Sequence, residues 1–171
     1  LDAELVLPTL LAIMSQVPVP PETPMAQALE ILSTWDYTGN TGIAEGYDAG
    51  DDPVTMTEPT EEEVRSAAAA TVWAAWRSML VRNTIYATLQ GAGLGDYMPN
   101  SKLAYNAFKH HLENYPTAGG VGASGVPFFS LGLGETVAYS LQQALEMLAS
   151  DEFAPAFGNS LNVMDYAWGK L

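Results

Sequence analysis

His110 and His111 are the only histidines in the chain, and they are adjacent. An imidazole can serve as a general base or a metal ligand near neutral pH. Successive residues of a helix point about 100° apart, so these two rings cannot bind one ion from the same helix face. His110 with Glu113 offers two ligands, which is a weak site. His111 falls on the apolar side of an expected helix and is expected to be structural.

The segment Gly120–Gly125 (GVGASG) matches the GxGxxG string. That motif binds a pyrophosphate when a strand precedes it and a helix follows it. Here an expected helix precedes it, and Pro127 disfavours helix at Val126. Ser124 does not satisfy the GxSxG pattern of a nucleophile elbow, because Val126 stands where the second glycine belongs. The segment is predicted to be a flexible or tightly turning loop.

Four acidic residues share one loop and could bind calcium: Glu45, Asp48, Asp51 and Asp52. Calcium prefers carboxylate and carbonyl oxygens, but the alternating ligands of an EF-hand loop are missing here. A solvated acidic turn is therefore the favoured interpretation. A small metal-binding domain built on this loop stays open as a further possibility.

Trp73, Trp76 and Tyr86 could build an aromatic pocket, but aromatic residues at helical spacing are more often part of a core. No cysteine is present, which excludes disulfides, thiol catalysis and zinc–thiolate sites. The residues do not supply a nucleophile, a base and an oxyanion pocket together. We therefore assign no catalytic, cofactor-binding or metal-ligating residue.

The composition is that of a globular domain with an acidic surface. The chain has 171 residues, 48% of them hydrophobic, and a formal net charge of −14 with six Lys and Arg. Such a surface repels nucleic-acid phosphates and anionic membranes, so neither is an expected partner. The longest apolar run, Leu5–Met14, contains Pro8 and is too short to span a bilayer.

Hydrophobic periodicity and capping signals predict mostly helix. Thr60 and Glu63 form a capping box before a stretch to Gln90 that has no Gly or Pro. No convincing alternating strand is found. The predicted helices are 5–14, with Pro8 near its first turn, 24–36, 60–90, 101–113 and 135–149.

The expected organisation is one helical unit, 1–171, with long Gly/Pro-rich loops. It comprises a helical hairpin at 1–36, a loop at 37–59, the central helix at 60–90, and further helices with a Gly-rich loop at 91–171. The fold class is mostly α.

Four segments, taken in order, resemble the penicillin acylase (penicillin amidase) family of N-terminal-nucleophile hydrolases. That family includes β-lactam acylases and acyl-homoserine-lactone acylases. In the last segment, Tyr166 replaces the first aromatic of the family's Trp-x-Trp-Gly run. The segments are Ala3–Ala12 (AELVLPTLLA), Ala28–Asp36 (ALEILSTWD), Ser66–Leu80 (SAAAATVWAAWRSML) and Leu141–Leu171, which ends NVMDYAWGKL.

The resemblance implies a helical subdomain excised from the β-chain of a larger α/β (αββα) hydrolase. Members hydrolyse a linear amide between an acyl group and an amine, using an N-terminal serine upstream of the region matched here. Calcium, which the family often binds, is expected elsewhere, so no cofactor is expected in this segment. The Trp-Gly-basic run is normally followed by a histidine and strands, so both ends of the chain are expected to be internal. The implied compartment of the parent protein is periplasmic or extracellular.

The expected function is therefore that of a structural, pocket-shaping piece of an amide hydrolase, inactive by itself. Its expected partners are the remainder of the parent chain and, in the parent, a small acyl-amide substrate. An apolar face left exposed would favour self-association of the segment. The alternative is an independent acidic helical module that binds a peptide or another protein.

Overall fold

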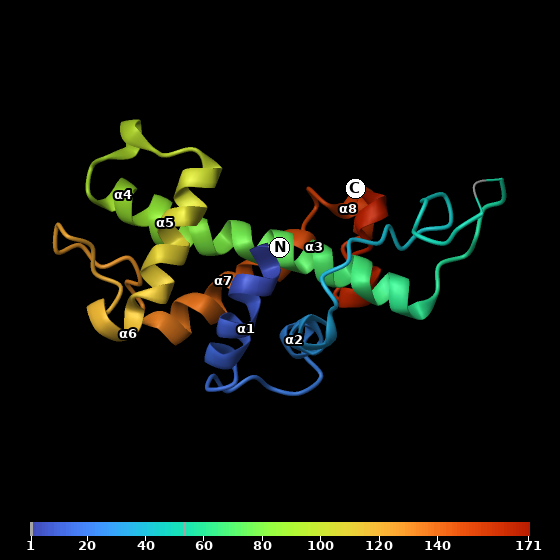
Figure 1. Cartoon of the computed structure of the whole chain (residues 1–171), viewed down its shortest axis with the longest axis horizontal. Helices are drawn as coiled ribbons and strands as arrows, with labels where there is room; N and C mark the ends of the chain where they lie inside the picture. Colours follow the sequence, from blue (N-terminus) through green and yellow to red (C-terminus); the bar gives the residue numbers. More distant parts are fainter. Residues whose placement is uncertain (1, 53) are drawn as a thin grey trace.

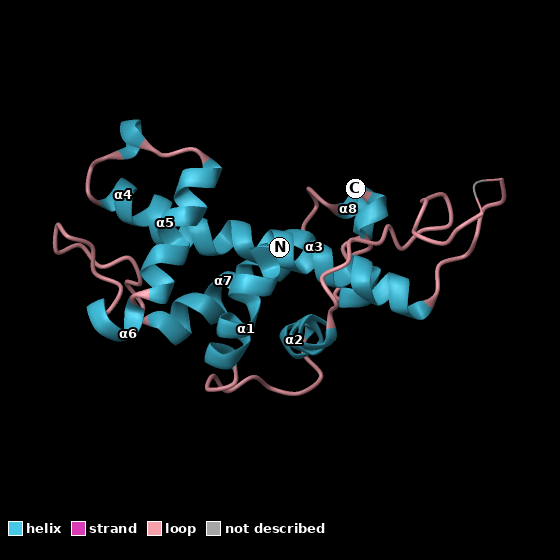
Figure 2. Cartoon of the chain, viewed as in Figure 1, coloured by secondary structure: helices cyan, strands magenta, loops and turns pink. Residues whose placement is uncertain are grey.

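A computed structural model describes residues 2–52 and 54–171 of the chain. It is mostly helical, and no β-strand occurs within those residues (Figure 2). One isolated antiparallel bridge joins Val121 and Pro127. The predicted fold class, mostly α, is confirmed at this level.

The helical elements of the described residues follow one another with loops of very different lengths (Figure 1). In chain order they are α1 (Asp2–Met14), α2 (Pro24–Thr34), α3 (Glu61–Val81), the π-helical turn η1 (Arg82–Tyr86), α4 (Ala87–Gly91), the 3-10 turn η2 (Gly95–Tyr97), α5 (Ser101–Glu113), α6 (Tyr115–Ala118), α7 (Leu133–Leu148), α8 (Ala154–Phe157), and the 3-10 turns η3 (Val163–Asp165) and η4 (Trp168–Lys170).

The longest helix, α3, runs through the middle of the molecule and continues through η1 into α4 (Figure 1). The predicted capping box is present at its start. The Thr60 hydroxyl accepts a hydrogen bond from the Glu63 backbone N–H at 3.3 Å, and the Glu63 carboxylate accepts one from the Thr60 N–H at 2.7 Å. These two bonds satisfy groups that a helix end leaves unpaired, which fixes where α3 begins.

The core lies where α3 packs along α7, the most extensive contact between elements. Trp76 is fully buried there, and its indole N–H donates to the Val137 carbonyl at 3.1 Å. Trp73 meets Trp76 edge-on, with ring centroids 6.4 Å apart. The prediction that these tryptophans belong to the core is confirmed.

The π-helical turn η1 was not predicted, and it sits against α7. Asn83 donates from its side-chain amide to the Ser140 hydroxyl at 3.1 Å and to the Gln143 side-chain oxygen at 2.8 Å. The buried Thr84 hydroxyl bonds back to the Leu80 carbonyl. A π turn admits one extra residue into the helix, which rotates the following face. Here it allows a polar amide of the α3–α4 rod to reach partners on α7.

The first helix differs from its prediction. It begins at Asp2, not at Leu5, so Pro8 lies in its middle and not near its first turn. A proline there removes the N–H that would bond to the Glu4 carbonyl. Both residues are exposed, so water can satisfy that carbonyl. The opposite face buries Leu7 and Leu10 completely and holds the helix in place.

We predict that Trp76→Phe lowers the free energy of unfolding by about 1–2 kcal/mol more than Trp73→Phe does. Both changes shorten a buried aromatic, but only the first also removes the indole N–H that donates to the Val137 carbonyl, a buried hydrogen bond worth about 1 kcal/mol. Chemical denaturation of both variants measures the difference. Equal losses would show that the indole hydrogen bond contributes nothing beyond packing.

Candidate functional site

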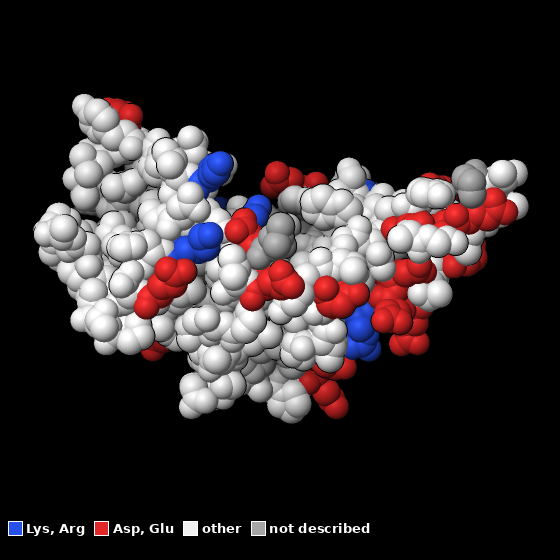
Figure 3. Space-filling view, viewed as in Figure 1, with Lys and Arg blue, Asp and Glu red and all other residues white. Residues whose placement is uncertain are grey.

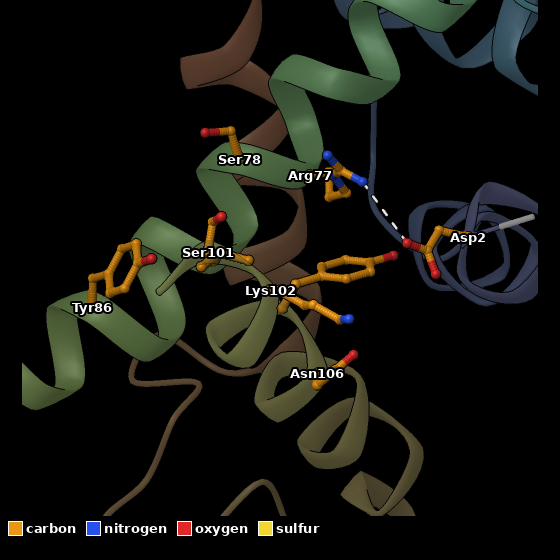
Figure 4. Close-up of a pocket in the computed structure, with 9 residues that line it drawn as sticks. Asp2, Arg77, Ser78, Tyr86, Ser101, Lys102 and Asn106 are labelled. Atoms are coloured by element: carbon orange, nitrogen blue, oxygen red, sulfur yellow. Dashed lines mark ion pairs between the residues drawn. The ribbon is translucent and has the colours of Figure 1, made fainter. Parts of the chain in front are cut away.

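A cleft of about 470 Å³ opens between α3, α5 and the start of α1 (Figure 4). We call it the cationic cleft, because Arg77 and Lys102 line it and Lys109 lies at its edge. Figure 4 shows Lys102 and Asn106 projecting from α5, and Arg77 pointing toward Asp2. Its lining residues are Asp2, Arg77, Ser78, Val81, Tyr86, Ser101, Lys102, Tyr105 and Asn106.

The Asp2 carboxylate is the negative group between two of these cations. It lies 3.9 Å from an Arg77 guanidinium nitrogen and 3.7 Å from the Lys109 ammonium. Both cations also stand over the Tyr105 ring, at 5.2 Å and 5.4 Å from its centroid. The ion pairs are long and partly exposed, and pairs of that kind contribute only about 0–1 kcal/mol. The carboxylate is therefore weakly held.

Tyr105 forms the floor between the cations and is 7% exposed. Its hydroxyl is buried, and the described residues offer it no hydrogen-bond partner. Burial raises the pKa of the phenol to about 12, the Asp2 charge adds to that rise, and Arg77 opposes it. The hydroxyl is therefore protonated at neutral pH and keeps its proton available to an acceptor.

A second hollow of about 280 Å³ lies on the other side of Arg77. We call it the aromatic pocket, since three tryptophans line it. The Trp35 indole N–H donates to the Thr38 carbonyl at 2.8 Å, which fixes that ring at the end of α2. Trp168 is 48% exposed at the rim. The lining residues are Trp35, Gly39, Ala70, Trp73, Ala74, Arg77 and Trp168.

Trp168 reaches this pocket because the C-terminal segment docks closely on the loop after α2. The Gly169 N–H donates to the Thr41 carbonyl at 2.7 Å. A Cβ added to Gly169 would lie 2.7 Å from that carbonyl oxygen and 2.7 Å from Ile43 Cγ1. Only glycine permits this approach of two backbones.

Asp48 departs from the solvated acidic turn that was expected. Its side chain is buried and accepts hydrogen bonds from the Thr41 backbone N–H and hydroxyl, each at 2.8 Å. Asp51 in turn accepts from the Asp48 N–H at 2.8 Å. Asp48 thus organises the loop, whereas Glu45 and Asp52 are exposed. Within residues 2–52 and 54–171, no group of three or more His, Asp or Glu side chains is arranged to hold a metal ion.

His111 lies flat on Phe128, with ring centroids 4.0 Å apart and planes 19° apart. Burial lowers the pKa of this histidine, and the neighbouring His110 lowers it further. His110 faces Asn114, whose side-chain amide lies 3.4 Å from its Nδ1. The two rings meet edge-on, with centroids 5.5 Å apart, but one packs on Phe128 and the other faces Asn114.

The Gly120–Gly125 segment forms a tight hairpin-like turn. The Gly122 N–H donates to the Val126 carbonyl at 3.0 Å, and the Phe128 N–H donates to the Gly120 carbonyl at 2.9 Å. Ser124 is exposed at the tip. Neither a strand before it nor a helix directly after it is present, so the arrangement for pyrophosphate binding is not formed.

No sequence motif marks the cationic cleft. A usable signal was the scarcity of basic residues. Three of the six Lys and Arg, namely Arg77, Lys102 and Lys109, fall on two helices that the periodicity had already predicted. The three side chains come together only because α5 packs against α3. The periodicity of each helix alone does not predict that packing.

Comparison with models of known protein families, with curated proteins and with solved structures yields no match for this chain. Among the described residues, no helix combines the length and the apolar character needed to cross a bilayer.

We predict that Gly169→Ala lowers the free energy of unfolding by about 1–3 kcal/mol, the usual cost of forcing an extra methyl group into a packed site. Amide exchange should rise first at Thr41 and in the C-terminal segment. Gly91→Ala is the matched control, because a Cβ there meets nothing within 4 Å. A Gly169→Ala protein as stable as the control would contradict the close docking.

We predict that Asp48→Asn loosens the loop before α3. The new amide N–H₂ would face the donors of Thr41, which leaves a buried donor unpaired at a cost of about 1–3 kcal/mol. Limited proteolysis should cut within 38–59 several times faster than in the parent. Glu45→Gln removes the same charge from an exposed position and should leave the cutting rate unchanged.

Proposed function

We propose that this chain is a helical segment of a penicillin-acylase-like amide hydrolase, where it lines part of the acyl-binding pocket without performing the chemistry. Support comes from where the resembling segments lie in the fold. Trp35 lies in one of them, Trp73 lies within another, and Trp168 lies in the last, yet all three side chains line the aromatic pocket.

The first of the resembling segments, Ala3–Ala12, lies within α1. Helix α1 packs on α7, which in turn packs along α3. The resembling segments are scattered over most of the sequence, but in the fold they gather around α3 and α7. Residues that resemble a family pattern and also share one pocket fit a common binding role better than an unrelated set of core positions would.

The chemistry of the aromatic pocket suits an acyl group. Indole rings offer large apolar faces, and each buried CH₂ of a ligand contributes about 0.8 kcal/mol. A volume of about 280 Å³ accommodates a short aliphatic or aromatic acyl chain. Exposed Trp168 gives a surface on which another layer of the parent protein would pack.

The proposal assigns the reacting groups to the remainder of the parent chain, which is also the main proposed partner. The substrate of the parent would be a small acyl amide, such as a β-lactam antibiotic or an acyl-homoserine lactone, in a periplasmic or extracellular setting. The segment alone would be inert, and its exposed apolar side chains would favour self-association.

We predict that Trp168→Ala in the intact parent protein raises KM for an amide with an aromatic acyl group by about five- to fifty-fold. Removing an indole from one wall of an apolar pocket costs binding of that order. The hydrolysis of an acetyl amide, which does not fill the pocket, should change little. Steady-state kinetics with both substrates measure the contrast.

Tyr139→Ala is the matched control, because Tyr139 is a comparably exposed aromatic on α7 that lines none of the hollows described above. Equal effects of the two variants on KM would refute the assignment of the pocket. Turnover of a chromogenic acyl amide by the isolated chain, above background, would refute the claim that the segment is inert.

The independent acidic helical module is the second candidate, and the charge distribution favours it. Figure 3 shows acidic side chains crowding one end of this face. The coding sequence after Leu171 separates the two candidates. A histidine followed by alternating apolar residues supports the acylase, and a stop codon supports the module.

A further inference from the structure

We propose that the cationic cleft is a binding site for a small organic carboxylate, which displaces Asp2 and takes its place between Arg77 and Lys109. The proposal is independent of the amide hydrolase activity. It concerns the hollow on the α5 side of Arg77, not the aromatic pocket on the other side.

Positive charge is concentrated around the cationic cleft. The chain carries a net charge of −14, yet three of its six basic residues surround this one cleft, with a single acidic residue among its lining. Cations that served only solubility or scattered ion pairs would be spread among the twenty acidic residues. Gathering them costs repulsion between like charges, and an anion bound between them would relieve it.

Asp2 occupies the position that a bound carboxylate would take. Its carboxylate lies within 4 Å of both Arg77 and Lys109, so the spacing of these cations already accepts a carboxylate. The contacts are too long to be good hydrogen bonds, which prefer about 2.7–2.9 Å between charged groups. A free carboxylate, not tethered to α1, could approach both cations more closely than Asp2 does.

The Tyr105 hydroxyl has no hydrogen-bond partner among residues 2–52 and 54–171. A buried hydroxyl without a partner costs about 1–3 kcal/mol, and native proteins retain few of them. Its side chain is more than nine-tenths buried and lines the cleft. A ligand oxygen would supply the missing acceptor. Ser101 and Lys102, in the first turn of α5, add the positive end of a helix dipole.

The apolar walls of the cleft favour an organic anion over an inorganic one. Val81, Tyr86 and the Tyr105 ring give the cleft apolar surface beside its charges. Inorganic phosphate or sulfate would leave that surface unused, whereas an aromatic or branched aliphatic carboxylate would cover it. A volume of about 470 Å³ accommodates a ligand of that size.

The test is a calorimetric titration of the whole chain with benzoate, with benzamide and inorganic phosphate as companion probes. We expect benzoate to bind with a Kd on the order of 1 mM or tighter, as suits so small a ligand. Benzamide, which lacks the charge, and phosphate, which lacks the apolar body, should each bind at least tenfold more weakly. No benzoate binding, or equal binding of phosphate, would overturn the proposal.

Two variants are expected to change benzoate binding in opposite directions, which tests whether benzoate binds at this cleft. Lys109→Gln should weaken benzoate binding about fivefold, the effect of one unit charge about 4 Å away in a well-solvated setting. Asp2→Asn should strengthen binding by a similar factor, because it removes the internal competitor. Both side chains are partly exposed, so neither change threatens folding.

Arg65→Gln and Glu30→Gln are the matched controls. Arg65 on α3 and Glu30 on α2 form an ion pair of 3.5 Å, and neither residue lines the cleft. They change the net charge by the same amounts as Lys109→Gln and Asp2→Asn. If the controls shift the Kd as much as the cleft variants do, the effect is general electrostatics and the site is refuted. Tyr105→Phe should weaken binding while leaving the protein as stable or more stable, since it removes an unpaired buried hydroxyl.

Discussion

The packing of α3 along α7 is the contact on which the rest of the molecule depends. Trp76 fills the space between the two helices and bonds through its indole to the Val137 carbonyl, so the register of one helix on the other is fixed by both volume and a hydrogen bond. Asn83, within the π turn η1, adds a second polar contact to α7, with Ser140 and Gln143 as its partners. Once α3 and α7 are in register, their joint surface provides the apolar face on which α1 and α2 pack. The opposite side of α3 is free to carry Arg77.

Electrostatics then divide the molecule into unlike parts. The acidic loop and the first turn of α3 hold many carboxylates, and the three glutamates after Thr60 stabilise the helix start. Asp48 has a different role. Its buried carboxylate accepts two hydrogen bonds from Thr41 and so holds the loop backbone in place. The few cations lie mostly near the other half of α3. That asymmetry gives a very acidic protein one place where an anion is attracted.

The sequence predicted the helices well because the signals for them are local. The capping box at Thr60 and Glu63 and the apolar spacing of α7 act within a few residues, so the elements they specify were predicted close to their observed bounds. The features that were missed depend on distant contacts. The π turn at Arg82–Tyr86 places Asn83 where it bonds to polar side chains of α7. Pro8 is tolerated in the middle of α1 because its face of the helix is exposed to solvent. The buried state of Asp48 likewise depends on Thr41, seven residues earlier.

Arg77 illustrates why the candidate sites could not be read from the sequence. It is one residue after the buried Trp76, so the packing of α3 on α7 turns it outward. There it borders two hollows of different chemistry: its guanidinium faces Asp2 in the cleft, and the residue also lines the aromatic pocket beside Trp73 and Trp168. An arginine is suited to both tasks, since its flat guanidinium binds carboxylates and its methylenes pack on rings. A lysine at this position would supply the charge but not the same planar, two-sided contact. The identity of the side chain at 77, and not its charge alone, is therefore what makes the two neighbouring hollows compatible on one helix face.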